Sequence, residues 1–146
     1  MEKLLTVKYP LALIAVFIWV GFVCAISFME AWLKFRAPGI NLPLGLGIGR
    51  IVFSALNKVE WVLAITVFFS YFLRKDYDFQ WTYLFFLMAF IILLLQTFYF
   101  LPVMDVRAEM HIQGLEVPAS KLHFVYVFIE AVKVISLIVF GLKLLK

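Results

Sequence analysis

The sequence predicts an all-α integral membrane protein, a four-helix bundle with both termini on the same side of the membrane. Of its 146 residues, 66% are hydrophobic and only 15% are charged, and the mean hydropathy of +1.06 lies well outside the range of soluble domains. Four apolar segments also reach the length of about 20 residues that a helix needs to cross the hydrocarbon core. An even number of crossings returns the chain to the side on which it begins.

The four spans are expected to form a single domain, residues 1–146. Pro10 opens the first span, because proline is tolerated in a first helical turn, and Pro102 is expected to close the third. Ser120 is a candidate N-cap for the fourth. The uncharged run at residues 9–29 is longer than a signal-peptide core, so the first span is expected to stay in the mature chain. The expected boundaries are residues 9–35, 47–73, 79–103 and 120–143.

The connections define two sides of the membrane. Side A holds both termini and the link at residues 74–78, and side B holds the other two connections. Lys and Arg residues number six on side A and five on side B, which, with the terminal amine, favours cytoplasmic termini. The net charge of +4 is spread over the loops without a basic block, so no nucleic-acid partner is indicated. On side A we expect an interfacial aromatic belt of Tyr9, Tyr71, Tyr77, Trp81 and Tyr83.

Residues 39–50, GINLPLGLGIGR, hold four of the seven glycines in the chain. Their GxGxG alternation, without a preceding strand, is not a dinucleotide-binding fingerprint. The segment predicts a bent or partly re-entrant entry into the second span. The alternative is a functional one, in which N–H groups at a helix N-terminus and the neighbouring Arg50 bind an anion.

The second and fourth spans carry charges near the middle of the membrane. Both spans enter from side B, which places Glu60 and Lys133 each about 20 Å along its helix and makes them candidate partners. Helical phase supports this pairing, because polar residues fall on one stripe of each span. The stripes are Arg50, Ser54, Asn57 and Glu60 on the second span and His123, Tyr126, Glu130 and Lys133 on the fourth.

Lys58 is not expected to join these stripes, because it lies about 160° from Glu60 around the helix. The carboxylate nearest in depth is that of Glu30 in the first span. The lysine stem leans toward side B, which helps Lys58 to reach it. The sequence therefore predicts contact of Lys58 with Glu30 or with a neighbouring protomer.

Mid-membrane charges cost a few kcal/mol each, so by default they mark a functional interior. The alternative is structural: salt bridges that fix the helix register, with Asn57 and Gln96 as hydrogen-bonding groups between helices. Polar residues gather toward side B, whereas the side-A halves of the spans are almost purely apolar, which favours a pocket open to one side. Its predicted ligand-binding residues are Arg50, Asn57, Glu60, His123, Tyr126, Glu130 and Lys133, with Arg36, Gln96, Asp105 and Arg107 at the mouth.

Other chemistry finds less support in the sequence. Glu109 and His111 are two residues apart and would lie on opposite sides of a helix, so no metal site is predicted. His111 lies outside the spans, which argues against bis-histidine haem, and no other cofactor is indicated. A membrane enzyme using Glu60 or Glu130 as an acid–base group lacks a nucleophile motif. The single cysteine, Cys24, is expected to pack in the core.

Three stretches occur in a recognisable order: GRIVFSALNKVEW entering the second span, FYFLPVMDVR closing the third and HFVYVFIEAVKV opening the fourth. In this order they resemble the transmembrane protein 205-like family of small four-span membrane proteins. The resemblance implies a handler of small molecules or a membrane accessory factor, and it carries over no catalytic residue.

The sequence thus predicts a membrane protein that binds or transports a small polar, anionic or amphipathic solute. Guanidinium groups near the mouth, those of Arg36, Arg50 and Arg107, would favour an anionic group such as a carboxylate or a lipid phosphate. Because four spans are few for a transporter, a homo-oligomer is a further expectation. Two other classes stay open: a structural or assembly subunit of a membrane complex, and a lipid-modifying enzyme.

Overall fold

The chain forms four long helical segments, and a computed structural model describes its residues 7–72 and 81–145. Each segment is long and apolar enough to cross a membrane, and the described ranges contain no strand. The predicted all-α, multi-pass four-helix bundle is therefore confirmed. The link at 74–78, with Tyr77, and the terminal charges Lys3 and Lys146 lie outside the described residues. The four segments are Pro10–Arg36, Leu42–Tyr71, Tyr83–Ile112 and Leu122–Lys143.

Two of the four spans contain π-helical turns. These are the first and third spans, whose sequences hold the long uncharged runs. The first consists of α1 (Pro10–Val23), the π-helical η1 (Cys24–Glu30), α2 (Ala31–Leu33) and the 3₁₀ turn η2 (Lys34–Arg36). The third consists of α4 (Tyr83–Leu95), the π-helical η3 (Gln96–Phe100) and α5 (Leu101–Ile112). The second and fourth spans are the continuous helices α3 (Leu42–Phe72) and α6 (Leu122–Lys143).

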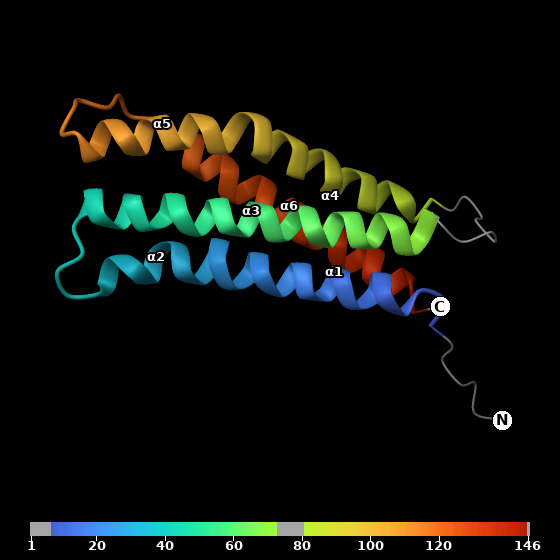
Figure 1. Ribbon diagram of the computed structural model, residues 1–146. Helices are drawn as coiled ribbons and strands as arrows, with labels where there is room; N and C mark the ends of the chain where they lie inside the picture. Colours follow the sequence, from blue (N-terminus) through green and yellow to red (C-terminus); the bar gives the residue numbers. More distant parts are fainter. Residues whose placement is uncertain (1–6, 73–80, 146) are drawn as a thin grey trace.

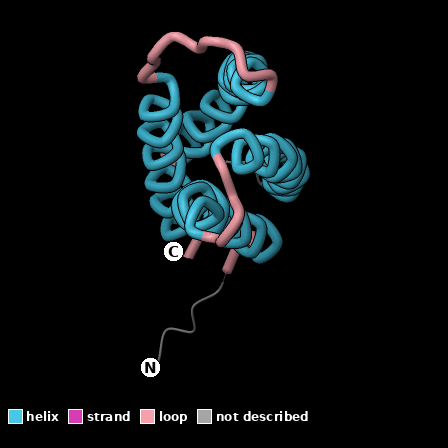
Figure 2. Tube along the Cα trace, turned by 90° about the vertical axis from the view of Figure 1, so that its left-hand side faces the viewer, coloured by secondary structure: helices cyan, strands magenta, loops and turns pink. Residues whose placement is uncertain are grey.

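Each span packs against two neighbours in an antiparallel bundle (Figure 1). The first span packs on α3 and α6, and the third packs on α3 mainly through α5 and on α6 through α4. Helices α3 and α6 therefore face each other diagonally across the bundle. Figure 2 shows the end where the chain passes from η2 to α3 and from α5 to α6, which is the side-B end. The described start of α1 and end of α6 lie together at the other end, the side-A end.

The glycine-rich segment enters the second span as ordinary α-helix, so the expected bent or re-entrant entry is wrong. Helix α3 begins at Leu42, because Asn41 caps it: the Asn41 Oδ1 accepts a hydrogen bond from Leu44 N at 3.0 Å. Pro43 lies in the first turn, where its missing N–H is not needed. These start signals precede the glycines at 45, 47 and 49 and place them inside the helix.

The glycines of α3 permit a close approach between the first two spans. A Cβ atom on Gly45 would overlap the Phe35 ring, and one on Gly49 would lie 3.1 Å from Lys34 Nζ. Both neighbours belong to η2. Because Gly45 and Gly49 have no side chains, the end of the first span lies directly against the first turns of α3.

The third span continues through Pro102 to Ile112 and does not end at the proline as expected. The π-helical η3 ends at Phe100, immediately before the α-helical pattern resumes at Leu101. Pro102 thus lies in the first turn of α5, where the winding passes from π-helical to α-helical. The extension adds Asp105 and Glu109 to the helical surface.

The side chain of Cys24 is exposed on the bundle surface, so its expected place in the core is wrong. Cys24 begins the π-helical η1, whose wider turns alter which residues face inward. Val23 and Ser27 are buried around it. Large apolar side chains elsewhere on the surface, such as Phe98 and Phe124, face outward and provide the contact with the lipid bilayer.

The tyrosines at the side-A end lie between the helices. Tyr9 and Tyr71 are buried and stack with ring centroids 4.7 Å apart, and Tyr83 packs against Tyr71 at 4.4 Å. The expected interfacial belt is therefore wrong for Tyr9 and Tyr71, which belong to the core. Trp81 is 79% exposed, as an interfacial residue would be.

The crossing of α1 and α6 depends on Gly141, which gives a first prediction. A Cβ there would lie 3.0 Å from the Phe17 ring and 3.1 Å from Val16. Gly141→Leu should therefore destabilise the protein by about 1–3 kcal/mol through overpacking. Gly21→Leu is the matched control, because nothing lies within 4 Å of a Cβ at Gly21. Thermal unfolding in detergent measures both, and equal midpoints for the two variants would contradict the packing.

Candidate functional site

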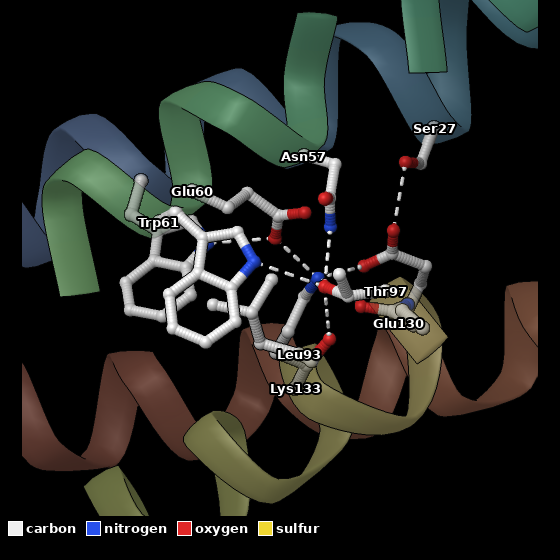
Figure 3. Close-up of polar contacts among 10 residues, drawn as sticks. Ser27, Asn57, Glu60, Trp61, Leu93, Thr97, Glu130 and Lys133 are labelled. Carbon is white, nitrogen blue, oxygen red and sulfur yellow. Dashed lines mark hydrogen bonds and ion pairs between the residues drawn. The ribbon is translucent and has the colours of Figure 1, made fainter. Parts of the chain in front are cut away.

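Three charged side chains meet inside the bundle: Glu60 of α3 and Glu130 and Lys133 of α6 (Figure 3). At most 1% of each residue is exposed. Lys133 Nζ forms an ion pair with the Glu60 carboxylate and lies 2.9 Å from Glu130 Oε2. The Glu60–Lys133 pair predicted from depth and helical phase is therefore confirmed. Because α3 and α6 are diagonal to each other, this ion pair crosses the bundle.

Uncharged polar groups from the other two spans complete the cluster. Trp19 of α1 donates from Nε1 to Glu60 Oε1 at 2.7 Å, and Gln96 accepts from Lys133 Nζ at 2.6 Å. Both side chains are fully buried. A buried ion pair is stable only when its remaining hydrogen-bonding capacity is met, and these contacts meet part of it. All four spans therefore contribute to one network.

The π-helical turns supply two members of this network. Ser27 lies in η1 and donates to Glu130 Oε1 at 3.1 Å, and Gln96 is the first residue of η3. A π-helical turn within an α-helix is uncommon and is frequent at functional sites. Here one occurs in each of the two spans that hold the long uncharged runs, beside the buried charges.

A second polar layer lies beside the cluster. Thr97 Oγ1 accepts hydrogen bonds from Asn57 Nδ2 at 2.9 Å and from Trp61 Nε1 at 3.0 Å. The same hydroxyl donates to the carbonyl of Leu93 at 2.8 Å. Figure 3 shows the hydrogen bond between Asn57 and Thr97. This layer joins α3 to the third span. In it the Thr97 hydroxyl has partners for its donor and for its acceptor positions.

Tyr126 covers the cluster one helical turn from Glu130. It is 2% exposed, interacts with Glu130 and packs edge-on against Phe53 and Phe100, with ring centroids 5.7 and 6.1 Å away. The aromatic rings exclude water from this part of the bundle. The buried charges are therefore enclosed by side chains on this side as well.

A cavity of about 650 Å³ lies toward the side-B end, next to the Asn57–Thr97 layer. Its walls come from the end of the first span, α3, η3, α5 and the start of α6, and most of its lining is apolar. Half of the polar residues that line it belong to α3, and the others come from the remaining three spans. The lining residues used below are Lys34, Phe53, Asn57, Lys58, Leu101 and His123.

Arg50 lines this cavity but is engaged by two carboxylates. Its Nε and Nη2 pair with the two oxygens of Asp105 in a fork, with Nη2–Oδ2 at 3.0 Å, and its Nη1 pairs with Glu109. The sequence placed Arg50 as a free guanidinium for an anionic ligand. The extended third span brings both carboxylates to it, so its charge is already balanced.

Lys58 is placed differently from its prediction. Glu30 pairs with Lys34, one turn along the first span, at 3.3 Å, so the expected Lys58–Glu30 contact is wrong. Over residues 7–72 and 81–145, no carboxylate lies within 4.0 Å of the Lys58 ammonium. Lys58 is exposed and lines the cavity. It is a lysine without a counter-charge on a membrane-spanning helix.

The remaining residues predicted for the mouth do not surround the cavity. Arg36 stacks over Trp32, with its guanidinium carbon 4.5 Å from the ring centroid, and Arg107 donates to the carbonyl of Pro118. Gln96 is fully buried in the ion cluster. Hydropathy alone placed these residues by depth and could not assign their partners.

The predicted ligand-binding set is thus divided between two places. Trp19 and Thr97 were not predicted, although an indole N–H in an apolar span requires a hydrogen-bond partner and was the available signal for Trp19. Lys34 also escaped prediction as a cavity residue. The cavity contains Arg50, Asn57, Asp105 and His123, whereas the enclosed cluster contains Glu60, Gln96, Tyr126, Glu130 and Lys133.

Neither metal ligation nor relatedness assigns a function to these features. Among the described residues, His, Cys, Asp and Glu side chains form no group of three or more that could hold a metal ion. Comparison of the chain with protein-family models, curated proteins and solved structures finds no match. Function must therefore be inferred from the cluster and the cavity.

Two lysines of these spans provide a second prediction. Lys133→Met removes the only cation of the buried cluster and leaves two carboxylates together, so it should destabilise the protein by about 3–5 kcal/mol. Lys58→Met makes the same chemical change at a lysine that forms no ion pair within residues 7–72 and 81–145, and it should leave the unfolding midpoint nearly unchanged. Thermal unfolding of the purified variants in detergent makes the comparison. A larger loss for Lys58→Met would refute the assigned roles.

Proposed function

We propose that this membrane protein binds, and transfers or transports, an anionic amphiphile in the side-B cavity. The carboxylate or phosphate head group contacts the Lys58 ammonium, and the apolar part lies against walls such as Phe53 and Leu101. Asn57 and His123 provide further hydrogen-bonding groups in the same cavity. This proposal retains the predicted one-sided ligand site and places its anion on Lys58 in place of the three arginines.

The exposed ammonium of Lys58, which has no carboxylate partner among the described residues, is the observation that carries the proposal. At 1.5 Å per residue, Lys58 lies about 24 Å along α3 from Leu42. From Lys58 toward side A, the exposed residues of the same helix, including Val62 and Ile65, are apolar. A lysine at such depth costs a few kcal/mol unless it is paired or lies in a water-filled cavity. An anionic ligand in the adjoining cavity would provide the missing counter-charge.

A second hollow, of about 560 Å³, supports entry from the bilayer. It is shaped by α3 and α5 and shares Arg50, Ser54, Lys58 and Asp105 with the first cavity. The two hollows therefore adjoin each other at these four residues. An amphiphile could move its head group past them from the lipid without leaving the membrane.

The wider setting is part of the same proposal. The slight excess of basic residues on side A favours cytoplasmic termini, which would make the cavity open away from the cytoplasm. A homo-oligomer would add further helices to a transporter that has four spans in each chain. The resemblance to the transmembrane protein 205-like family implies a small-molecule handler or a membrane accessory factor, and the first of these agrees with this function.

Binding of a fluorescent long-chain fatty acid gives the third prediction, with its uncharged methyl ester as the control ligand. Wild-type protein in detergent should bind the acid more tightly than the ester. Lys58→Met should weaken binding of the acid about tenfold or more, equivalent to about 1.4 kcal/mol, and should leave ester binding unchanged. Lys58→Arg keeps the charge and should retain most of the affinity.

Equal binding of acid and ester by wild-type protein would refute the proposed anion site. If neither ligand binds, while the protein co-purifies in fixed proportion with another membrane protein, the assembly-subunit alternative replaces it. Mass spectrometry of lipids that co-purify with wild type and with Lys58→Met would identify the natural ligand class.

A further inference from the structure

The buried cluster holds one more negative group than positive. Glu60 and Glu130 both contact Lys133 Nζ, and no other basic side chain is among the groups assigned to the cluster. With both carboxylates ionised, the enclosed site would carry a net charge of −1. Moving one uncompensated charge into such an interior costs several kcal/mol, so the excess requires a neutralising cation.

The geometry favours a proton over a metal cation as this neutralising charge. The Lys133 ammonium already occupies the point where Glu60 Oε1, Glu130 Oε2 and Gln96 Oε1 converge. A monovalent metal ion would have to displace the ammonium, because oxygen-rich coordination is what such an ion requires. A proton needs only one carboxylate oxygen and no additional space.

The hydrogen-bond pattern leaves room for that proton. Glu130 Oε2 lies 2.9 Å from Lys133 Nζ but has no partner with hydrogen-bond geometry, and Gln96 Nε2 is a buried donor without an acceptor. A like-charged carboxylate pair close to one cation favours protonation of one member. The other groups that face the pair are neutral: Trp19 and Ser27 donate to it.

We propose that Glu60, Glu130 and Lys133 form a proton-binding site that holds one exchangeable proton shared between the two carboxylates. The neighbouring phenol of Tyr126 is the one further titratable group that the structure places against them. In this state the site is neutral: one ionised carboxylate pairs with the ammonium and the other is a carboxylic acid. The site is distinct from the cavity and does not depend on what the cavity binds.

Infrared spectroscopy of the intact protein in a detergent without carbonyl groups tests this site. A protonated carboxyl group has a C=O stretching band separate from those of carboxylates and amides. Wild-type protein at neutral pH should show such a band, and it should shift when water is replaced by D₂O, because the proton exchanges. Absence of the band, or a band that does not shift in D₂O, overturns the proposal, and neither result needs a variant.

Two variants assign the band to the cluster. Glu60→Gln and Glu130→Gln each leave one carboxylate opposite Lys133, so each should lose the band while remaining folded. Glu30→Gln is the matched control, since Glu30 pairs with Lys34 outside the cluster, and it should keep the band. A band that persists in both cluster variants belongs to another carboxyl group and refutes the site. If one cluster variant fails to fold, the other still tests whether the band belongs to the cluster.

Discussion

The ion pair between Glu60 and Lys133 is the interaction on which the rest of the structure depends. It joins the two diagonal helices, α3 and α6, which otherwise meet mainly through their shared neighbours. Breaking a buried pair leaves a charge without compensation, whereas replacing both partners can be nearly neutral. In a bundle whose helix surfaces are as apolar as lipid, such a contact specifies rotation and depth more sharply than hydrophobic packing can.

The pair also explains why the apolar spans are not entirely apolar. Trp19 and Ser27 in the first span, and Gln96 and Thr97 in the third, each direct a polar group toward the charged helices or the layer beside them. The two π-helical turns bring Ser27 and Gln96 into this arrangement. The structural and functional interpretations of the buried charges are therefore compatible, because the same contacts that hold the helices enclose a titratable site beside an accessible cavity.

Hydropathy was sufficient for the four spans, and depth with helical phase was sufficient for Glu60 and Lys133, because α3 and α6 are regular helices. Reasoning from hydropathy failed where the winding changes, because Cys24 was assigned to the core from its apolar segment and is exposed in η1. It also failed where partners depend on how far a helix extends: Arg50 meets Asp105 because the third span continues past Pro102. Lys58 lacked its expected partner because Glu30 pairs with Lys34, one turn away in the first span. A comparison of depths between helices does not detect such a partner within the same helix.

The π-helical turns have a consequence for how this sequence can change. Each turn accommodates extra backbone within an otherwise α-helical span, so loss of one residue from η1 would restore α-helical winding without breaking the span. Because a π-helical turn takes about one residue more than an α-helical turn for the same rotation, the residues beyond the deletion would keep nearly the same direction around the helix axis. Lys34 and Phe35 would still line the cavity and Trp19 would stay beside Glu60, whereas Ser27, within η1, would change its position. Single-residue deletions at this point would therefore alter the contact between Ser27 and Glu130 and spare the cavity.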